Sequence, residues 1–307
     1  MKKNYVKSPL NYIGGKYKLL SQIEPIFPKN INKFVDLFGG GLNVGINVKA
    51  DKIIYNDIIN HLIDLFKEFK ENSLEDILNH IEDRIDEYEL SKENEFGYKK
   101  FRKYYNITKR SLDLYVLICY SFNYQIRFNN SHEFNNPFGR NRSSFSPALK
   151  KKLIRFINAL DKKNIEFSNK DFNKFDISNL SENDFVYCDP PYLITTGSYN
   201  DGKRGFKGWS EKEEVQLLNL LDKLDENKIR FALSNVLEHK GRVNDLLLKW
   251  SDKYFIHELN SDYSNCNYQT KNKSIAGSRE VLITNYRTTS NNKNNVIESS
   301  QLKINII

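Results

Sequence analysis

The spacing of hydrophobic residues predicts strands at the start of the chain. Residues 33–38 (KFVDLF) and 52–57 (KIIYND) are short apolar runs with polar ends, which is typical of buried strands. Between them, the sequence GGGLNVGINV predicts a tight glycine turn that leads into a helix. A strand, a turn with a helix and a second strand form a βαβ unit, so the chain is expected to begin a parallel sheet.

The pattern changes at about residue 60. Apolar residues then recur at i, i+3, i+4 and i+7 as far as about residue 122, which predicts a block of amphipathic helices. Residues 122–147, rich in asparagine, aromatic residues and arginine, are predicted to form an ordered loop or a two-stranded ribbon. Beyond them strands and helices alternate again, with helices expected at 148–160, 211–226 and 240–250 and strands at 164–169, 184–189, 228–235, 254–260 and 279–286.

This order predicts one α/β sheet domain with an insertion. The sheet domain is assigned to residues 1–60 and 146–290, and the mainly helical insertion to residues 61–145. Residues 291–307 have neither a helical nor a strand period, so we expect them to form a flexible tail.

Composition narrows the class of protein. No apolar run approaches the roughly 20 residues of a membrane helix, and the basic N-terminus lacks the apolar core of a secretory signal, so a cytoplasmic protein is expected. Cys119, Cys188 and Cys266 have no metal-ligand spacing and imply neither a disulfide framework nor a metal site. The net charge of +8 favours a polyanionic partner, although an A/T-rich genome would also enrich lysine.

Carboxylates follow the first two predicted strands. Asp36 precedes Gly39, Gly40 and Gly41, where the backbone turns sharply and a ligand can approach closely. Asp57 ends the next strand, where a carboxylate meets ribose hydroxyls in nucleotide-binding sheets. The glycine spacing misses the dinucleotide fingerprint by one residue, so a nucleoside-type cofactor other than NAD is expected. The alternative is a glycine turn without a ligand.

A second motif ends the strand at 184–189. The sequence VYCDPPY places Asp189 before Pro190 and Pro191, whose fixed φ angles hold the chain as a stiff turn, and Tyr192 follows. Taken alone, this turn could simply terminate a strand with a packed tyrosine.

The motifs together resemble the DNA adenine-N6 methyltransferases of the Dam group, the D12 class. The matching pieces occur in that family's order and cover nearly the whole chain: NYIGGKYKLL, FVDLFGGGLNVG, YNDI, FNNPFGR, FSNKDF, VYCDPPY, FALSN and SREVLITNY. The resemblance implies a Rossmann-like sheet that binds S-adenosyl-L-methionine, an inserted DNA-recognition domain and double-stranded DNA as the substrate.

The resemblance also implies roles for individual residues. Asp189 and the carbonyl of Pro190 would accept the amino hydrogens of adenine, Pro191 would stiffen the turn, and Tyr192 would stack on the flipped-out base. The cofactor would contact a set of residues from five motifs: Tyr12, Gly14, Lys16, Asp36, Phe38, Gly39, Gly40, Gly41, Asp57, Asp171, Phe172 and Asp189.

For DNA, the family places a reading ribbon at about residues 122–142. Arg127 would contact a guanine and Phe122 would wedge into the base stack, while Lys99 and Lys103 belong to a basic run that suggests a phosphate track. Gln125 and Asn11 depart from the GATC enzymes of the family, which bears on the recognised sequence. The remaining residues assigned to DNA are Asn123, Pro137, Arg140 and Arg142.

Three functions remain open on the sequence. GATC methylation at adenine N6 is the first expectation, with a restriction endonuclease of the same site as a candidate partner. Methylation of cytosine N4 uses similar geometry, but that group usually carries serine where this chain has Asp189. A catalytically silent nucleic-acid-binding protein is the third. Four intact residues argue against it: Asp36, Asp57, Asp189 and Tyr192.

Overall fold

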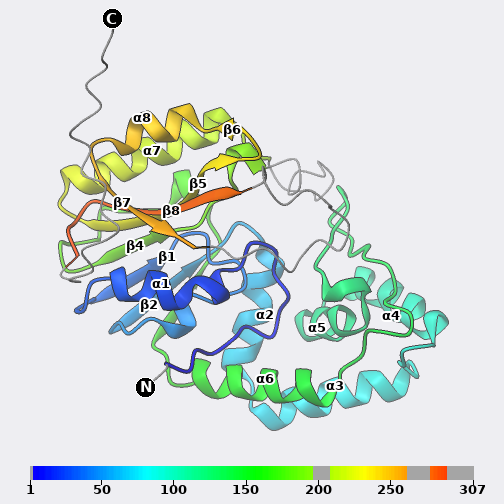
Figure 1. Cartoon of the computed structure of the whole chain (residues 1–307). Coiled ribbons are helices and arrows are strands. Elements are labelled where there is room, and N and C mark those ends of the chain that lie inside the picture. The colour runs from blue at the N-terminus through cyan, green and yellow to red at the C-terminus, as the bar shows by residue number, and fades with distance from the viewer. Residues whose placement is uncertain (1–2, 196–207, 261–276, 289–307) are drawn as a thin grey trace, which may run out of the picture.

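The computed structural model describes residues 3–195, 208–260 and 277–288, and within them an eight-stranded sheet runs through the molecule (Figure 1). Its strand order is β3-β2-β1-β4-β5-β8-β7, with β6 paired to β5. The strands are β1 Lys33–Asp36, β2 Lys52–Asn56, β3 Ile165–Ser168, β4 Phe185–Cys188, β5 Arg230–His239, β6 Arg242–Val243, β7 Phe255–Leu259 and β8 Ser278–Thr284.

Five of these strands are parallel and form the part of the sheet that positions the site. β3, β2, β1, β4 and β5 pair in parallel, whereas β8 lies antiparallel between β5 and β7. The chain leaves β1 toward β2, and β4 lies on the other side of β1, so the strand order reverses between β1 and β4. Loops diverge at such a point and leave a crevice at the carboxyl ends of the strands.

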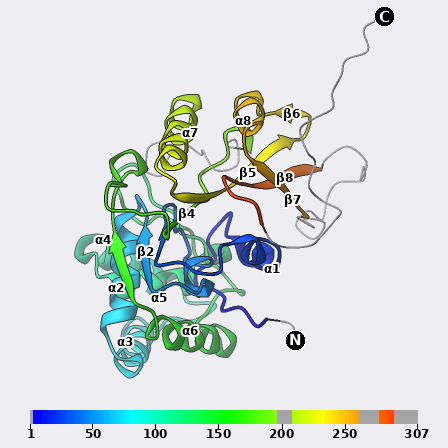
Figure 2. The ribbon, with the colours of Figure 1, turned by 90° about the vertical axis from the view of Figure 1, so that its left-hand side faces the viewer.

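Both faces of the sheet centre are buried. Phe34 and Phe185 pack on the side of the short helix α1 (Leu20–Ile23), whereas Val35 and Val186 pack under helices α7 (Glu211–Glu226) and α8 (Asp245–Ser251). Successive strand residues point to opposite faces, so a continuous apolar run suits a strand that is covered on both sides. Figure 2 shows α7 and α8 on one side of the sheet and α1 on the other. The expected α/β class is confirmed.

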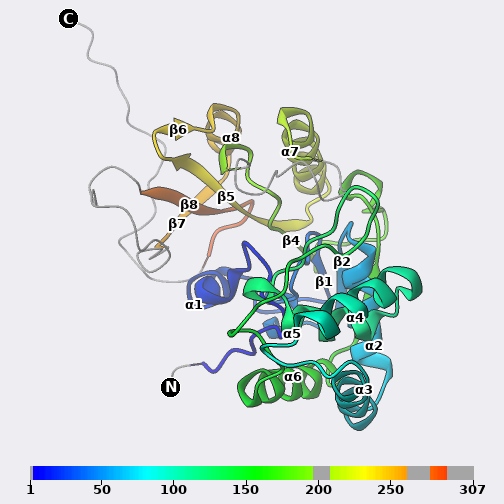
Figure 3. The same cartoon turned by 90° about the vertical axis from the view of Figure 1, so that its right-hand side faces the viewer.

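A helical block follows β2 and returns to β3. It comprises α2 Asn60–Glu71, α3 Leu74–Glu87, α4 Glu95–Thr108, α5 Ser111–Tyr120 and α6 Pro147–Leu160. Helix α5 packs against α2, α3 and α4 within this block (Figure 3). Every residue from Asp113 to Tyr120 is buried. One hydrophobic cluster runs from Tyr55 of the sheet through Phe66 of α2 to Phe156 of α6. This cluster joins the sheet to the inserted helices, so it does not separate two domains. The domain boundaries at 60/61 and 145/146 stay a prediction.

The glycine turn does not lead into an α-helix, as the sequence predicted. Only a single 3-10 turn, η3 Gly45–Asn47, follows it. The side chain of Asn43 accepts a hydrogen bond from the backbone N–H of Ser8, and the side chain of Asn47 pairs with both backbone groups of Val6. These asparagines tie the loop to the N-terminal segment, and local side-chain bonds of this kind compete with helix formation.

Two other expectations change near the ends of elements. The helix expected at 240–250 begins at Asp245, because β6 first pairs with the end of β5 across Lys240 and Gly241, which have φ values of 51° and 75°.

The segment expected at residues 122–147 is mainly an ordered loop. It has two isolated antiparallel bridges, Ser121 to Phe138 and Phe128 to Phe134. The proposed tail at 291–307 lies outside the described residues.

Within the described ranges, no helix is both long and apolar enough to cross a membrane.

Candidate active site

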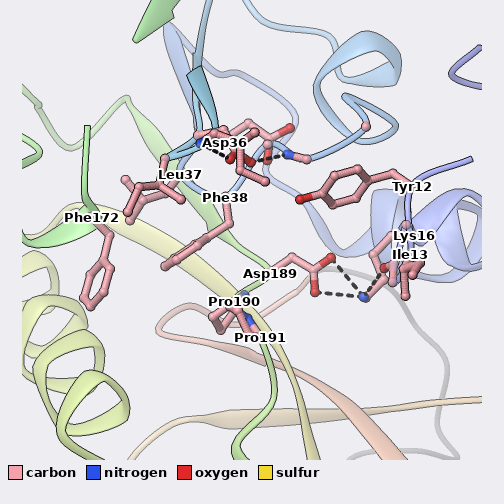
Figure 4. A pocket seen from close by; sticks show the side chains of 18 of the residues that line it. Tyr12, Ile13, Lys16, Asp36, Leu37, Phe38, Phe172, Asp189, Pro190 and Pro191 are labelled. Atoms are coloured by element: carbon pink, nitrogen blue, oxygen red, sulfur yellow. Dashed lines mark hydrogen bonds and ion pairs between the residues drawn. The ribbon is translucent and has the colours of Figure 1, made fainter. Parts of the chain in front are cut away.

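A cavity of about 460 Å³ opens at the carboxyl ends of β1, β2 and β4, where the strand order reverses. Figure 4 shows side chains from the N-terminal segment, the glycine turn and the Asp-Pro-Pro turn around it. Every residue assigned from the sequence to the cofactor or to catalysis lines this cavity: Tyr12, Gly14, Lys16, Asp36, Phe38, Gly39, Gly40, Gly41, Asp57, Asp171, Phe172, Asp189, Pro190, Pro191 and Tyr192.

The glycine turn lies against two tyrosine rings. A Cβ atom at Gly39 would stand 2.1 Å from the ring of Tyr55, and one at Gly40 would stand 2.9 Å from the ring of Tyr12. Gly40 also has a φ of +48°, and its carbonyl accepts a hydrogen bond of 2.6 Å from the Tyr55 hydroxyl. Larger residues would therefore clash with the ring of Tyr55 or of Tyr12, so the glycines let the turn lie directly against these rings.

Two buried carboxylates flank this turn. Asp36 accepts a hydrogen bond of 3.1 Å from the N–H of Gly45, and burial raises its pKa to about 7. Asp57 accepts bonds from the N–H groups of Gly40 (2.8 Å) and Ile59 (2.9 Å), and burial raises its pKa to about 6. Each oxygen of Asp57 accepts one of these bonds and keeps acceptor capacity for another donor, such as a hydroxyl of a ligand.

Asp189 is held by a lysine and a tyrosine. The Lys16 ammonium, only 4% exposed, lies 2.8 and 2.9 Å from its two carboxylate oxygens. The Tyr192 hydroxyl donates a third bond of 2.9 Å to it. Burial raises the pKa of Asp189, while Lys16 and Tyr192 act to lower it. The carboxylate thus has positioned donors in a site that excludes most water.

The sequence reasoning missed a second acid beside Asp189. Glu280 on β8 is 1% exposed, lies 3.7 Å from the Lys16 nitrogen and accepts a bond of 3.3 Å from the Tyr192 hydroxyl. The motif SREVLITNY contained this residue, but a single glutamate in a strand pattern gives no local signal of a buried role. Only the pairing of β8 with β5 brings Glu280 to the end of β4.

Trp209 lines the cavity, and the sequence reasoning did not identify it either. It precedes α7 and packs with Phe38 and Phe172 at ring-centroid distances of 5.4 to 5.7 Å. The sequence offers only a weak signal for Trp209, which is that it directly precedes the helix-capping sequence beginning at Ser210.

Residues assigned to base reading lie on the loop beside the cavity. Arg127 is exposed, while its neighbours Ile126 and Phe128 line the cavity. Phe122 is 40% exposed, and the guanidinium of Arg142 lies 5.1 Å from the centre of its ring.

Backbone contacts fix the start of this loop. The Asn11 side chain donates to the carbonyl of Asn123, and the Asn136 side chain donates to that of Gln125. The N–H of Phe122 donates to the carbonyl of Pro137.

The residues assigned to phosphate binding lie apart from the cavity. Lys99 and Lys103 are exposed on α4. Lys99 pairs with Glu95 at 2.8 Å, and Arg140 pairs with the same glutamate. None of the residues assigned to DNA lines the cavity, so any role that they have in DNA binding would lie outside it.

In the described ranges, no group of three or more histidine, cysteine, aspartate or glutamate side chains could hold a metal ion.

A sheet of this order, with a glycine turn and an Asp-Pro-Pro-Tyr turn at its strand ends, defines a methyltransferase fold. The model of the D12 class N6 adenine-specific DNA methyltransferase family matches residues 12–265, and the chain belongs to that family. The predicted family, and with it adenine rather than cytosine as the family's target, is confirmed.

Three relatives of this chain are named as a methyltransferase or as methylases. It is 60% identical over 283 residues to the type II methyltransferase M.FokI of Planomicrobium okeanokoites, covering 92% of this chain and 43% of that protein. It is 56% identical over 288 residues to the modification methylase StsI of Streptococcus sanguinis, covering 93% and 44%. The DNA adenine methylase of Haemophilus influenzae is 30% identical over 195 residues, covering 60% and 63%. The chain spans less than half the length of the first two relatives.

Proposed function

We propose that this chain transfers a methyl group from S-adenosyl-L-methionine to N6 of an adenine that is flipped out of duplex DNA. The observation that carries the proposal is the position of Asp189. Its carboxylate follows β4 on a turn stiffened by Pro190 and Pro191, in the same cavity as the glycine turn and Asp57. A nucleoside site and an acceptor for an amino group therefore adjoin each other.

The cavity fits the nucleoside part of the cofactor. Asp57 has remaining acceptor capacity for ribose hydroxyls, and the glycine turn lines the same cavity. Asp171 and Phe172 line the same cavity. When bound, S-adenosyl-L-methionine would supply the activated methyl group on its sulfonium sulfur.

The chain would supply acceptors and orientation. Asp189 would accept one amino hydrogen of adenine and the carbonyl of Pro190 the other, which concentrates the lone pair on N6 and makes it a better nucleophile. Lys16 and Tyr192 already contact the carboxylate of Asp189, so the amino group would share that carboxylate with them or displace one of them. Tyr192, now 8% exposed, would form one wall for the flipped base.

The DNA side of the proposal rests on the loop around Arg127. This exposed side chain lies beside the cavity mouth, where it could reach a guanine edge in the major groove. GATC is the first sequence to test, because the Dam group methylates it. The names of the relatives also suggest a modification role, so we include a restriction endonuclease of the same site among the partners. We keep the cytoplasm as the proposed location, as expected from the sequence.

The test is the identity of the methylated base. The purified chain would be incubated with S-adenosyl-L-methionine and duplex DNA, and the digested nucleosides would be separated by mass spectrometry. N6-methyladenine is expected. N4-methylcytosine as the only product would contradict the proposal, and so would the absence of any methylated base when S-adenosyl-L-methionine is shown to bind. Sequencing that detects modified bases would then give the recognised site.

A further inference from the structure

Three aromatic side chains from separate segments meet at one end of the cavity. Phe38 follows β1, Phe172 begins the 3-10 turn η5 (Phe172–Lys174), and Trp209 precedes α7. Their rings pack in mutual contact, with centroids 5.5 Å apart for Phe38 and Phe172, 5.7 Å for Phe38 and Trp209, and 5.4 Å for Phe172 and Trp209. All three line the cavity, so together they form an aromatic wall.

The orientation of Trp209 is fixed by a buried acid. Its indole N–H donates a bond of 2.6 Å to Glu214, which is 0% exposed. The other carboxylate oxygen of Glu214 accepts bonds from the side chains of Asn235 (3.1 Å) and Asn244 (3.2 Å). Burying a carboxylate is costly unless it is fully hydrogen-bonded, and here the bonds serve to hold one indole ring in place.

The wall lies at the end of the cavity away from the reacting groups. In Figure 4, Phe172 lies on the opposite side of Phe38 from Lys16 and Tyr12, and Asp189 lies toward Lys16. The methyl group must be transferred close to Asp189, so the wall is left for the nucleoside end of the cofactor. The rings are tilted or edge-on to one another, and such an apolar aromatic surface suits a purine ring, since aromatic rings associate by stacking or edge contact.

We propose that Trp209, oriented by Glu214, is a cofactor-binding residue whose ring packs on the adenine of S-adenosyl-L-methionine together with Phe38 and Phe172. This assignment rests on the proposed function, which places that cofactor in the cavity. Trp209 is the binding residue, and Glu214 is a positioning residue that acts through it.

The chain offers an internal control, because it contains only two tryptophans. Trp250 on α8 donates its N–H to Asp222 (2.8 Å), packs on Tyr254 and does not line the cavity. The variant Trp250→Phe therefore reports on Trp209 alone, and Trp209→Phe reports on Trp250 alone. Fluorescence would be recorded during titration with S-adenosylhomocysteine, adenosine and methionine, while calorimetry measures S-adenosylhomocysteine binding independently.

In Trp250→Phe, S-adenosylhomocysteine and adenosine should change the emission, whereas methionine should not. In Trp209→Phe the emission should stay constant although calorimetry still detects binding. Trp209→Ala should weaken S-adenosylhomocysteine binding by roughly 3- to 10-fold, the scale of one lost aromatic contact. Glu214→Gln places an amide donor among the donors of Trp209, Asn235 and Asn244, so it should also weaken binding and shift the emission of Trp209.

Constant emission in Trp250→Phe while calorimetry detects S-adenosylhomocysteine would overturn the role of Trp209 and leave the proposed function standing. An emission change with methionine but not with adenosine would overturn it as well. If the unmodified chain bound no S-adenosylhomocysteine, the proposed function would fail first and this assignment with it. If Trp209→Ala does not fold, as judged by circular dichroism, the comparison of Trp209→Phe with Trp250→Phe still decides whether Trp209 contacts the cofactor.

Discussion

A single buried lysine is shared by two carboxylates at the centre of the site. Lys16 lies within 3.7 Å of both Asp189 and Glu280, and the Tyr192 hydroxyl bridges the same two acids. Removing the cation would leave two carboxylates buried without their charge partner, which is far more costly than removing a surface pair. At the scale of single residues, the charge balance of the site therefore depends on Lys16.

Replacement of Lys16 by methionine tests this balance. Lys16 lowers the pKa of Asp189, so its loss should let Asp189 ionise only at higher pH. The acid limb of the rate–pH profile should move to higher pH, and the melting temperature should fall. Lys18→Met, an exposed lysine in the same turn, is the matched control. An unchanged profile in Lys16→Met would show that the pair does not control the ionisation of Asp189.

Asp189→Ala should abolish methyl transfer and leave the fold intact. The substitution removes the acceptor for the reacting amino group, and loss of one preorganised partner of this kind costs on the order of 10²-fold or more in rate. Single-turnover rates and S-adenosylhomocysteine affinity should be measured together, with the exposed Asp252→Ala as a control. A nearly normal single-turnover rate would remove Asp189 from the mechanism.

Cofactor affinity should rise with pH because of Asp57. Burial raises the pKa of this group to about 6, so it is partly protonated below that pH, whereas ribose hydroxyls bind best to the ionised form. Calorimetry with S-adenosylhomocysteine between pH 5 and 8 should show tighter binding as the pH rises through about 6. Asp57→Asn should bind more weakly and lose this step. If the pH dependence of cofactor affinity persists in Asp57→Asn, Asp57 is not its source, and Asp36, whose pKa is about 7, becomes the candidate.

At the scale of elements, the turn after β1 depends on contacts that a strand pattern does not contain. Gly39 and Gly40 lie against Tyr55, which comes from β2, and Tyr12, which comes from the N-terminal segment. Parallel pairing of β1 and β2 places Tyr55 opposite Asp36, directly before the turn. The turn is therefore held by its neighbours, and its shape is not set by the glycines alone.

Gly39→Ala should destabilise the fold. Its Cβ would stand 2.1 Å from the ring of Tyr55, which is 0% exposed and has no room to move. Overpacking of this kind typically costs about 1–3 kcal/mol, so thermal unfolding should shift downward by several degrees and S-adenosylhomocysteine should bind more weakly. Gly277→Ala meets nothing within 4 Å and should leave both values unchanged. Equal melting temperatures for the two variants would contradict the packing argument.

At the scale of the whole molecule, one loop connects the cavity with the expected DNA surface. Ile126 and Phe128 face the cavity, and the exposed Arg127 lies between them. Phe128 also stacks on His61 of α2, with ring centroids 4.3 Å apart. The loop that would read DNA is therefore packed against the site that would bind the cofactor.

Arg127→Ala should relax the choice of base at one position of the recognised site. A bidentate contact to guanine contributes about 1–3 kcal/mol of discrimination, so single-base variants of the site should react at more similar rates. Lys103→Ala should instead weaken all duplexes alike and reduce the salt dependence by about one unit of slope. If Arg127→Ala slows every duplex by one factor and keeps the ranking of sites, Arg127 contacts the backbone.

Local patterns in the sequence were sufficient for the α/β class and for most element positions. The apolar runs of β1, β2 and β4 and the motifs around Asp36, Asp57 and Asp189 could be read without a structure, because strand burial and turn chemistry are encoded by near neighbours. All the residues assigned to the cofactor and to catalysis then meet in one cavity, because the carboxyl ends of parallel strands share one edge of the sheet.

The tertiary structure determined the features of the site that depend on contacts between residues far apart in the chain. The expected helix after the glycine turn is absent because Asn43 and Asn47 bind residues near the N-terminus. Glu280 comes to Lys16 and Tyr192 through the antiparallel pairing of β8, and Trp209 comes to the cavity through the packing of α7. Such contacts join residues far apart in the chain, and their energies depend on burial and geometry that no local sequence pattern contains.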